Sequence, residues 1–384
     1  MYFQRKIGKP DAFGVYLHVP FCASTCDFCS FYQKLPKRKD LELYLEGIIQ
    51  EIKTIKVKKH VDTIFWGGGT PGLLSIKNLE LLGYQLIKSF LSYPSEWTIE
   101  MTPSTVNPKK VKALLDMGVT RISMGVQSFQ PETLKELGRA HKSKQIYKAY
   151  EILRSQGCKN INLDLIFAIP GQSMNSWELD LIEAKKLEPE HISTYCLTFE
   201  EDTPLYLKLS QGKVQIDFER ELAFYKKTWE FLNQNEYMQY EISNFSRIGF
   251  ECEHNLNTWA MSNWLGLGPS ACSQYMDKRF SNPISIDAWH KKVFEKKIKK
   301  ENFVILTDKI KAIDSLIFGL RMNAGIDLQE LSQRFPKIYF GNLNSYWRAC
   351  ERAKLLKYYK ERISLTNSGR LLADRIGADL LEIF

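Results

Sequence analysis

The stretch that decides the fold is Tyr16-Leu17-His18-Val19-Pro20-Phe21-Cys22-Ala23-Ser24-Thr25-Cys26-Asp27-Phe28-Cys29. An apolar run, which predicts a strand, leads directly into three cysteines with the spacing Cys-x3-Cys-x2-Cys. Three thiolates can ligate three irons of a four-iron, four-sulfur cluster and leave the fourth iron open to a small molecule. The alternative is a structural zinc site, which normally has four ligands, often in two Cys-x2-Cys pairs, and the sequence has no second pair.

The composition is that of an ordinary globular protein. The chain has 384 residues, 44% hydrophobic and 25% charged, which is enough for a barrel-sized domain and a smaller one. The sequence contains no apolar run of membrane-spanning length, and residues 1–6 lack the apolar stretch of a signal peptide. We therefore expect a cytoplasmic protein, because a reducing compartment also suits a labile cluster.

The net charge is +9, and lysines gather at Lys56, Lys58 and Lys59 and in the segment 291–300. Such lysines usually form the solvated face of a helix. The alternative is attraction to an anionic partner: a propionate-bearing ligand, an acidic protein, or a lipid surface that the protein contacts peripherally. The sequence has no nucleic-acid recognition motif, so we expect no nucleic-acid partner.

Short apolar runs alternate with longer amphipathic stretches up to about residue 245. The predicted strands cover residues 15–19, 63–66, 98–101, 121–125, 162–167 and 192–197, and helical spacing of apolar residues recurs in 41–52, 111–117 and 146–153. This alternation predicts an α/β fold with a parallel sheet, either a partial TIM-type barrel of six β/α units or a doubly wound sheet. In a barrel, the cysteine loop lies on the C-terminal rim, where active sites lie.

The sequence pattern changes after residue 304. Helices are predicted at residues 309–321, 328–335, 346–356 and 371–384, and a β-hairpin at 358–366, with Asp327 as an N-cap and Pro336 as a stop. Helices followed by a β wing predict a small winged-helix-like domain for packing or for a partner, with DNA binding the weaker alternative. We therefore expect a barrel with the cluster at 1–245, a connecting segment at 246–304 and a C-terminal domain at 305–384.

Polar residues follow several of the predicted strands. The glycines at 67–69 leave no side chain between the backbone and a ligand, so peptide groups can contact a small polar molecule. Asp164 stands inside an apolar strand, where a carboxylate is costly to bury unless it is paired or liganded. With Glu100, Gln127 and Arg139, it can bind ribose hydroxyls and an amino-acid carboxylate; each residue alone is also consistent with a structural hydrogen bond.

The cysteine spacing, with an aromatic residue before the last cysteine, resembles the radical S-adenosylmethionine superfamily. The segments 67–71, 125–129, 163–172 and 240–245 resemble more closely the family of oxygen-independent coproporphyrinogen III oxidases (HemN) and heme chaperones (HemW). The resemblance implies that Cys22, Cys26 and Cys29 hold a 4Fe–4S cluster whose open iron binds S-adenosylmethionine and can cleave it to a 5′-deoxyadenosyl radical. The positions implied to contact this cofactor are Tyr16, Phe28, Gly68, Gly69, Thr70, Glu100, Gln127, Arg139 and Asp164, with a looser match at Cys196.

Two functions stay open within this family, and we assign no catalytic residue. One is a chaperone that binds heme and hands it to acceptor proteins. The other is an enzyme that oxidatively decarboxylates two propionates of coproporphyrinogen III to vinyl groups. Phe31 favours the chaperone, because the oxidases carry a fourth cysteine two residues past the third. The short stretch before the first predicted strand favours it too, because the oxidases have a long extension there.

His254 is the third feature that favours the chaperone. It begins the segment His254-Asn255-Leu256-Asn257-Thr258-Trp259, which resembles the His-Asn-x-x-Tyr-Trp motif of the chaperones, with Thr258 in place of tyrosine. A neutral imidazole is a good ligand for heme iron; the alternatives are Cys252 as the ligand and a structural histidine. The expected partners are heme or a porphyrin, heme-acceptor proteins, and an electron donor such as flavodoxin or ferredoxin. A homodimer stays open.

Overall fold

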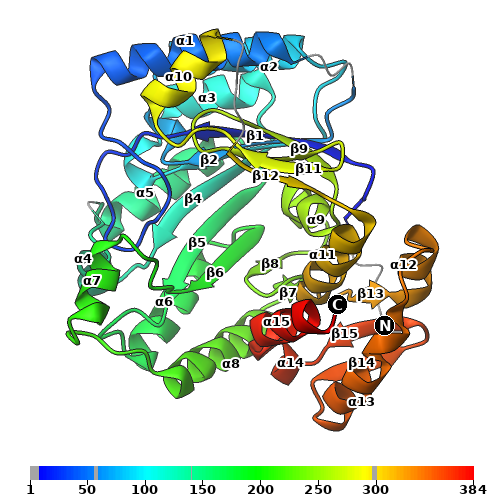
Figure 1. Cartoon of the computed structure of the whole chain (residues 1–384). Coiled ribbons are helices and arrows are strands. Elements are labelled where there is room, and N and C mark those ends of the chain that lie inside the picture. Colours follow the sequence, from blue (N-terminus) through cyan, green and yellow to red (C-terminus); the bar gives the residue numbers. More distant parts are fainter. Residues whose placement is uncertain (1–7, 56–58, 140, 296–300) are drawn as a thin grey trace.

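The computed structural model describes residues 8–55, 59–139, 141–295 and 301–384. Its centre is a run of six parallel strands that lie side by side in chain order (Figure 1). These are β1 (Phe13–Val19), β2 (Thr63–Gly68), β3 (Glu96–Met101), β4 (Arg121–Gln127), β5 (Ile161–Phe167) and β6 (His191–Cys196). The predicted α/β fold with a parallel sheet and a smaller C-terminal domain is confirmed.

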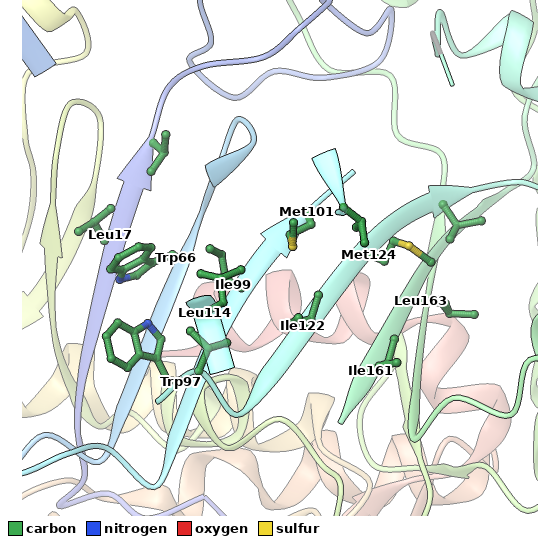
Figure 2. Close-up of a cluster of buried hydrophobic side chains, with 14 of the residues drawn as sticks. Leu17, Trp66, Trp97, Ile99, Met101, Leu114, Ile122, Met124, Ile161 and Leu163 are labelled. Carbon is green, nitrogen blue, oxygen red and sulfur yellow. The ribbon is translucent and has the colours of Figure 1, made fainter. Parts of the chain in front are cut away.

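Helices follow the strands, and most of them cover one face of this sheet. They are α1 (Arg38–Thr54), α2 (Ile76–Lys88), α3 (Pro108–Met117), α4 (Pro131–Glu136), α5 (Ser143–Ser155), α6 (Met174–Lys186), α7 (Pro204–Ser210) and α8 (Phe218–Gln234), with short 3-10 turns at Pro71–Leu73 and Pro103–Thr105. Figure 2 shows Leu17, Trp66 and Ile99 pointing from successive strands into the core, where Leu114 of α3 also lies. The apolar stripes of the helices are buried against these residues.

The opposite face of the same strands carries the polar side chains. Successive residues of a strand point to opposite faces, so Tyr16 and His18 face away from the core that holds Leu17. Glu100 in β3 and Asp164 in β5 obey the same alternation. The strand pairing then places Asp164 next to Gly125 of β4. The period of two thus separates the core face from the face that can hold a ligand.

The segment 246–304 extends the main sheet. It contains α9 (Glu253–Trp259), β9 (Asn263–Leu267), β10 (Cys272–Tyr275), β11 (Lys278–Ser281) and α10 (Ile286–Phe294), and the sheet continues in β12 (Glu301–Ile305). β9 pairs parallel with β1, and β10 to β12 continue antiparallel. At the other edge, β8 (Asn244–Ser246) and β7 (Met238–Gln239) follow β6. The predicted domain division is not tested, but this segment contributes strands to the main sheet and is therefore more than a connection.

The C-terminal part has its own hydrophobic cluster and a three-stranded sheet. Its elements are α11 (Asp308–Arg321), β13 (Ile326–Asp327), α12 (Leu328–Arg334), a 3-10 turn (Phe340–Leu343), α13 (Asn344–Arg352), β14 (Leu356–Tyr359), β15 (Arg362–Leu365), α14 (Asn367–Leu371) and α15 (Ala373–Ile383). The predicted hairpin is confirmed, and Asp327 caps α12 by accepting from the amide of Glu330 (3.0 Å).

Two helix boundaries differ from the prediction. The third predicted helix ends at Arg352, and Lys354 adopts a positive φ of 57° that turns the chain, so Leu356 begins β14. The last predicted helix is two helices, because Leu372 between them has a non-helical backbone (φ −113°, ψ 18°).

No helix in the described ranges is long and apolar enough to cross a membrane. Some residues used to interpret the sequence lie outside the described ranges. They are residues 1–6, Lys56, Lys58 and the lysines at 296–300.

Candidate functional site

The three cysteines lie in a loop after β1 that backbone hydrogen bonds fix in place. The amide of Cys22 donates to the carbonyl of Lys34 (3.0 Å), and the amide of Cys29 donates to the carbonyl of Cys26 (3.3 Å). All three thiols are free, and Arg139 Nη1 donates to Cys26 Sγ (3.3 Å). Burial raises the pKa of Cys22 to about 11 and also raises the pKa of Cys29. Both groups are therefore neutral thiols until a metal displaces the proton.

The described residues contain no group of three or more His, Cys, Asp and Glu side chains that is placed to hold a metal ion. A tetrahedral zinc ion needs its ligands within about 2.3 Å of one centre. A four-iron cluster takes each thiolate on a different iron and therefore needs them further apart.

The Gly-rich loop after β2 packs directly on the cysteine loop. The amide of Gly69 donates to the carbonyl of Val19 (2.8 Å). A Cβ on Gly69 would lie 2.6 Å from the Phe21 carbonyl oxygen, and a Cβ on Gly68 (φ +105°) would lie 2.5 Å from the His18 ring. Glycine is therefore required here for contact between two protein loops, a reason that the sequence analysis did not give.

Two carboxylates line the same pocket as the thiols. Asp164 accepts hydrogen bonds from Ser123 Oγ (2.8 Å) and Asn162 Nδ2 (2.9 Å), and Glu100 accepts from the amide of Gly68 (3.2 Å). Burial raises the pKa of both carboxyl groups, and the nearby charge of Asp164 helps to bring the pKa of Glu100 to about 8. The charge of Arg121 acts in the other direction and lowers the pKa of both groups, but it does not cancel the effect of burial. A cationic ligand would complement them.

Arg139 and Gln127 lie on either side of the space above Gly125. A Cβ on Gly125 would lie 3.0 Å from both Arg139 Nη2 and Gln127 Nε2. Gln127 has a positive φ of 67° at an irregularity in the pairing of β4 with β5, which is a strained backbone of the kind found at functional sites. Arg139 Nε is buried and has no hydrogen-bond partner among the described residues. An anionic group of a ligand can satisfy this donor.

We call this space of about 440 Å³ the cysteine pocket. It brings together every residue predicted to hold the cluster or its cofactor except Tyr16: Cys22, Cys26, Phe28, Cys29, Gly68, Gly69, Thr70, Glu100, Gln127, Arg139 and Asp164. Tyr16 faces the adjoining space, and its hydroxyl lies 3.1 Å from His18 Nδ1. Which of these residues contact a cofactor stays a prediction.

A larger space of about 1080 Å³, the large cavity, adjoins the cysteine pocket. The two share the lining residues Ser30, Phe31, Gly68, Glu100, Tyr195, Cys196 and Thr198. The volume is at the upper end of the range found for ligand sites in proteins. A ligand in the large cavity would therefore lie beside any cofactor in the cysteine pocket.

His254 lines the large cavity from α9. Its Nδ1 lies 2.8 Å from Thr63 Oγ1, and its ring packs against Phe65 with 5.3 Å between centroids. Its amide donates to Glu96 Oε1 (3.0 Å). Burial, with a smaller effect from the charge of Arg121, lowers the pKa of His254 to about 4. The imidazole is therefore neutral at pH 7, the form that ligates iron.

The alternative ligand Cys252 is fully buried and does not line the large cavity. Its Sγ donates to Glu96 Oε1 at 3.5 Å. Thr258, which stands where the motif has tyrosine, donates from Oγ1 to the carbonyl of His254 (2.9 Å) within α9. Of the two candidate ligands, only His254 is thus placed to meet a molecule in the cavity.

Comparisons with known proteins agree with this architecture. The model of the Radical SAM superfamily matches residues 16–181, and that of the HemN C-terminal domain matches residues 306–372. Two relatives named heme chaperone HemW, from Lactococcus lactis and Bacillus subtilis, are each 31% identical to this chain. The alignments cover 96% of this chain and 96% and 99% of the two relatives. The chain belongs to the HemW family of the radical SAM superfamily.

The fold of this HemW-family chain is also found in a solved structure, that of coproporphyrinogen III oxidase (HemN) from Escherichia coli. The TM-score is 0.83 at 23% identity, and the match covers 97% of this chain and 91% of that one. The likeness concerns the fold, and it confirms the predicted radical SAM architecture with an additional C-terminal domain.

The cysteine pocket fits the two groups that the superfamily implies, a 4Fe–4S cluster and S-adenosylmethionine. Three free thiols face it, as a cluster with one open iron requires. S-adenosylmethionine carries an ammonium and a sulfonium, which suit the buried carboxylates of Glu100 and Asp164. It also carries a carboxylate, which suits the unpartnered Nε of Arg139. The donor set of this HemW-family chain thus matches the charges of its expected cofactor.

Several residues that line the large cavity were not predicted from the sequence, including Phe65, Arg321 and Asp374. The signal for Phe65 was available, because it alternates in β2 with the core residues Ile64 and Trp66 and must face the other way. Arg321 and Asp374 gave no such signal, because they belong to the C-terminal region and only the tertiary fold brings them to β1 and β2.

Proposed function

We propose that this chain is a heme chaperone, which binds heme in the large cavity with His254 as an iron ligand and transfers it to acceptor proteins. The observation that supports this most directly is a neutral imidazole on the wall of a cavity of about 1080 Å³. When Nδ1 carries the proton and donates to Thr63 Oγ1, Nε2 keeps a lone pair for iron. The relatives named heme chaperone HemW support the same function.

The cysteine pocket is part of this proposal. Cys22, Cys26 and Cys29 would hold the cluster, and Glu100, Asp164 and Arg139 would bind the charged groups of S-adenosylmethionine. When bound, the cluster supplies one-electron chemistry, which an electron donor such as flavodoxin or ferredoxin would support. We place the protein in the cytoplasm, where a reducing environment keeps its cysteines free.

His254→Ala tests the heme site. We expect it to weaken hemin binding at least tenfold, equivalent to about 1.4 kcal/mol, and to shift the Soret band, because an iron ligand is lost. The measurement is a hemin titration followed by absorption spectroscopy. His60→Ala, which removes an exposed histidine, is the matched control and should leave both affinity and spectrum unchanged. Unchanged affinity in His254→Ala would place the iron ligand elsewhere.

A second function, coproporphyrinogen III oxidation, is favoured by one observation. The large cavity shares Glu100 and Gly68 with the cysteine pocket, so a porphyrinogen in the cavity would lie next to the cofactor. The test is an anaerobic assay of the reconstituted protein with coproporphyrinogen III, S-adenosylmethionine and a reductant. Multiple turnovers to protoporphyrinogen IX would establish an oxidase. No product, together with hemin binding that depends on His254, supports the chaperone.

A further inference from the structure

We infer that Arg321, stacked on Trp259, binds a carboxylate of the molecule that occupies the large cavity, and so fixes its orientation relative to His254. The inference rests on the proposed function, in which that molecule is heme and the carboxylate is one of its propionates. Neither the sequence motifs nor the family comparisons assign a role to Arg321.

Arg321 and Trp259 form one unit on the cavity wall. The guanidinium carbon of Arg321, the last residue of α11, lies 5.3 Å from the centroid of the Trp259 ring, and the same ring contacts Phe318 of α11 (5.6 Å). Both Arg321 and Trp259 line the large cavity. Figure 1 shows α9 and α11 next to each other, between the main sheet and the rest of the C-terminal region. Stacking on an aromatic face holds a guanidinium in one plane, ready for a planar carboxylate.

The hydrogen-bonding capacity of this unit is largely unused. A guanidinium has five N–H donors, and the contacts of the described residues satisfy only Nη1, which donates to Asp374 Oδ1 (2.7 Å). Arg321 Nε and Trp259 Nε1 are both buried without a hydrogen-bond partner among the described residues. A buried donor without a partner costs free energy. A ligand acceptor that reaches the donor, after a small adjustment of the side chains, would form the missing hydrogen bond and remove this cost.

The carboxylates already near Arg321 do not occupy it fully. The side chain of Asp374 is 95% exposed, so its ion pair is weak and water can replace it. Glu241 also lines the cavity, but it accepts from the amide of Ser243 (2.9 Å) and from Asn244 Nδ2, and no hydrogen bond joins it to Arg321. A ligand carboxylate can therefore displace Asp374 and form the stronger, less exposed pair.

The spacing on α9 suits a flat ligand that contacts both residues. His254 and Trp259 are five positions apart, which is about 7.5 Å along a helix. His254 and Thr258 form one row on the helix surface, and Asn255 and Trp259 form the adjacent row; all four line the cavity. An iron held by His254 would thus leave the edge of the macrocycle, which carries the propionates, near the Arg321 end of α9.

The test compares hemin with hemin dimethyl ester, whose propionates carry no charge. Both are titrated into the full-length wild type and into Arg321→Gln, with affinity and the Soret band as readouts. We expect Arg321→Gln to bind hemin roughly 10- to 100-fold more weakly, because a charge-assisted pair is lost. The affinity for the ester and the position of the Soret band should not change, since His254 still ligates the iron.

Arg375→Gln is the matched control, because it removes the same charge from an exposed pair with Asp379 outside the cavity. It should bind hemin like the wild type. Wild-type affinity for hemin in Arg321→Gln would overturn the inference and leave the proposed function intact. Equal weakening for hemin and for the ester would also overturn it, since Arg321 would then act only through packing. A wild type that binds no hemin would overturn the proposed function, and the inference with it.

Discussion

At the scale of single residues, the site is organised by two buried carboxyl groups, and the charge of Arg121 only partly offsets the effect of burial on their pKa values. Glu100 and Asp164 line one pocket, and burial raises the pKa values of both. Burial of the two carboxyl groups costs folding free energy, and a cationic ligand would offset this cost when it binds. The free protein is therefore less stable, but its affinity for such a ligand is higher.

Glu100→Gln tests this exchange through the pH dependence of stability. The pKa of Glu100 is about 8 in the folded protein, above the 4.5 of a free side chain. The unfolded chain therefore loses the proton first, and the contribution of Glu100 to stability falls as pH rises from 4.5 through 8. Glutamine does not titrate, so relative to the wild type the variant should gain stability with rising pH, by an amount on the order of 5 kcal/mol at pH 9. Urea unfolding of the cluster-free protein at pH 5, 7 and 9 measures this.

The same variant should bind S-adenosylmethionine more weakly, by about tenfold, because a neutral amide no longer attracts its positive groups. Equilibrium dialysis with the reconstituted protein measures the affinity. A stability difference that does not vary with pH would contradict the assigned titration of Glu100, whatever the binding result.

At the scale of elements, the site depends on two loops that follow neighbouring strands. β1 and β2 pair in parallel, so the cysteine loop and the Gly-rich loop leave the sheet at the same edge and pack on each other. The amide of Thr70 donates to the carbonyl of Phe21 (2.7 Å), and Thr70 Oγ1 lies 3.9 Å from Cys22 Sγ. The position of the thiols is thus set partly by a loop that contributes no thiol.

Gly69→Ala tests this dependence. Its Cβ would lie 2.6 Å from the Phe21 carbonyl oxygen, a backbone atom that cannot rotate away. We expect a loss of about 2 kcal/mol in unfolding free energy and a reduced yield of cluster on reconstitution, measured by iron content and visible absorbance. Gly212→Ala is the control: its φ of +69° carries a conformational cost but nothing lies near its Cβ, so cluster yield should be normal. Full cluster yield in Gly69→Ala would show that the loops move independently.

At the scale of the whole molecule, a buried carboxylate of α1 helps to fix the segment after the six parallel strands, which also pairs with them through β9 and β1. Glu51 of α1 accepts hydrogen bonds from the amide of Gly268 (2.7 Å), Asn282 Nδ2 (2.8 Å) and Trp289 Nε1 (3.1 Å). All three donors lie in the segment that adds β9 to β11 and α10 to the fold. Since Asn282 also lines the large cavity, Glu51 helps to hold one wall of that cavity in place.

Glu51→Ala should destabilise the protein by about 3 kcal/mol or more, because it leaves three buried donors without an acceptor. Denaturant unfolding followed by tryptophan fluorescence measures the loss. Glu46→Ala is the control on the same helix. Glu46 is exposed and pairs with His290 (3.3 Å), and the loss of this pair should cost less than 1 kcal/mol. Equal effects of the two variants would mean that the segment is held by its strand pairing alone.

The sequence by itself determined the six parallel strands, three of the helices that follow them and the C-terminal hairpin. Those features depend on local periodicity, and the C-terminal ends of parallel strands lie at one edge, which is why Cys22, Glu100 and Asp164 line one pocket. The break between α14 and α15 at Leu372 and the start of β14 at Leu356 were not predicted. A single non-helical residue does not change the spacing of apolar residues along the chain.

Only the tertiary structure decided the large cavity and the environment of His254. Thr63, which lies 2.8 Å from the His254 ring, is 191 positions away in the sequence, and Arg321 reaches the same cavity from the C-terminal region. It also decided that Gly68 and Gly69 lie too close to His18 and Phe21 to carry a side chain. This close approach depends on the positions of two loops, which the sequence pattern does not give. Periodicity fixes which face a residue occupies, but contacts between distant segments follow from the packing of the complete chain.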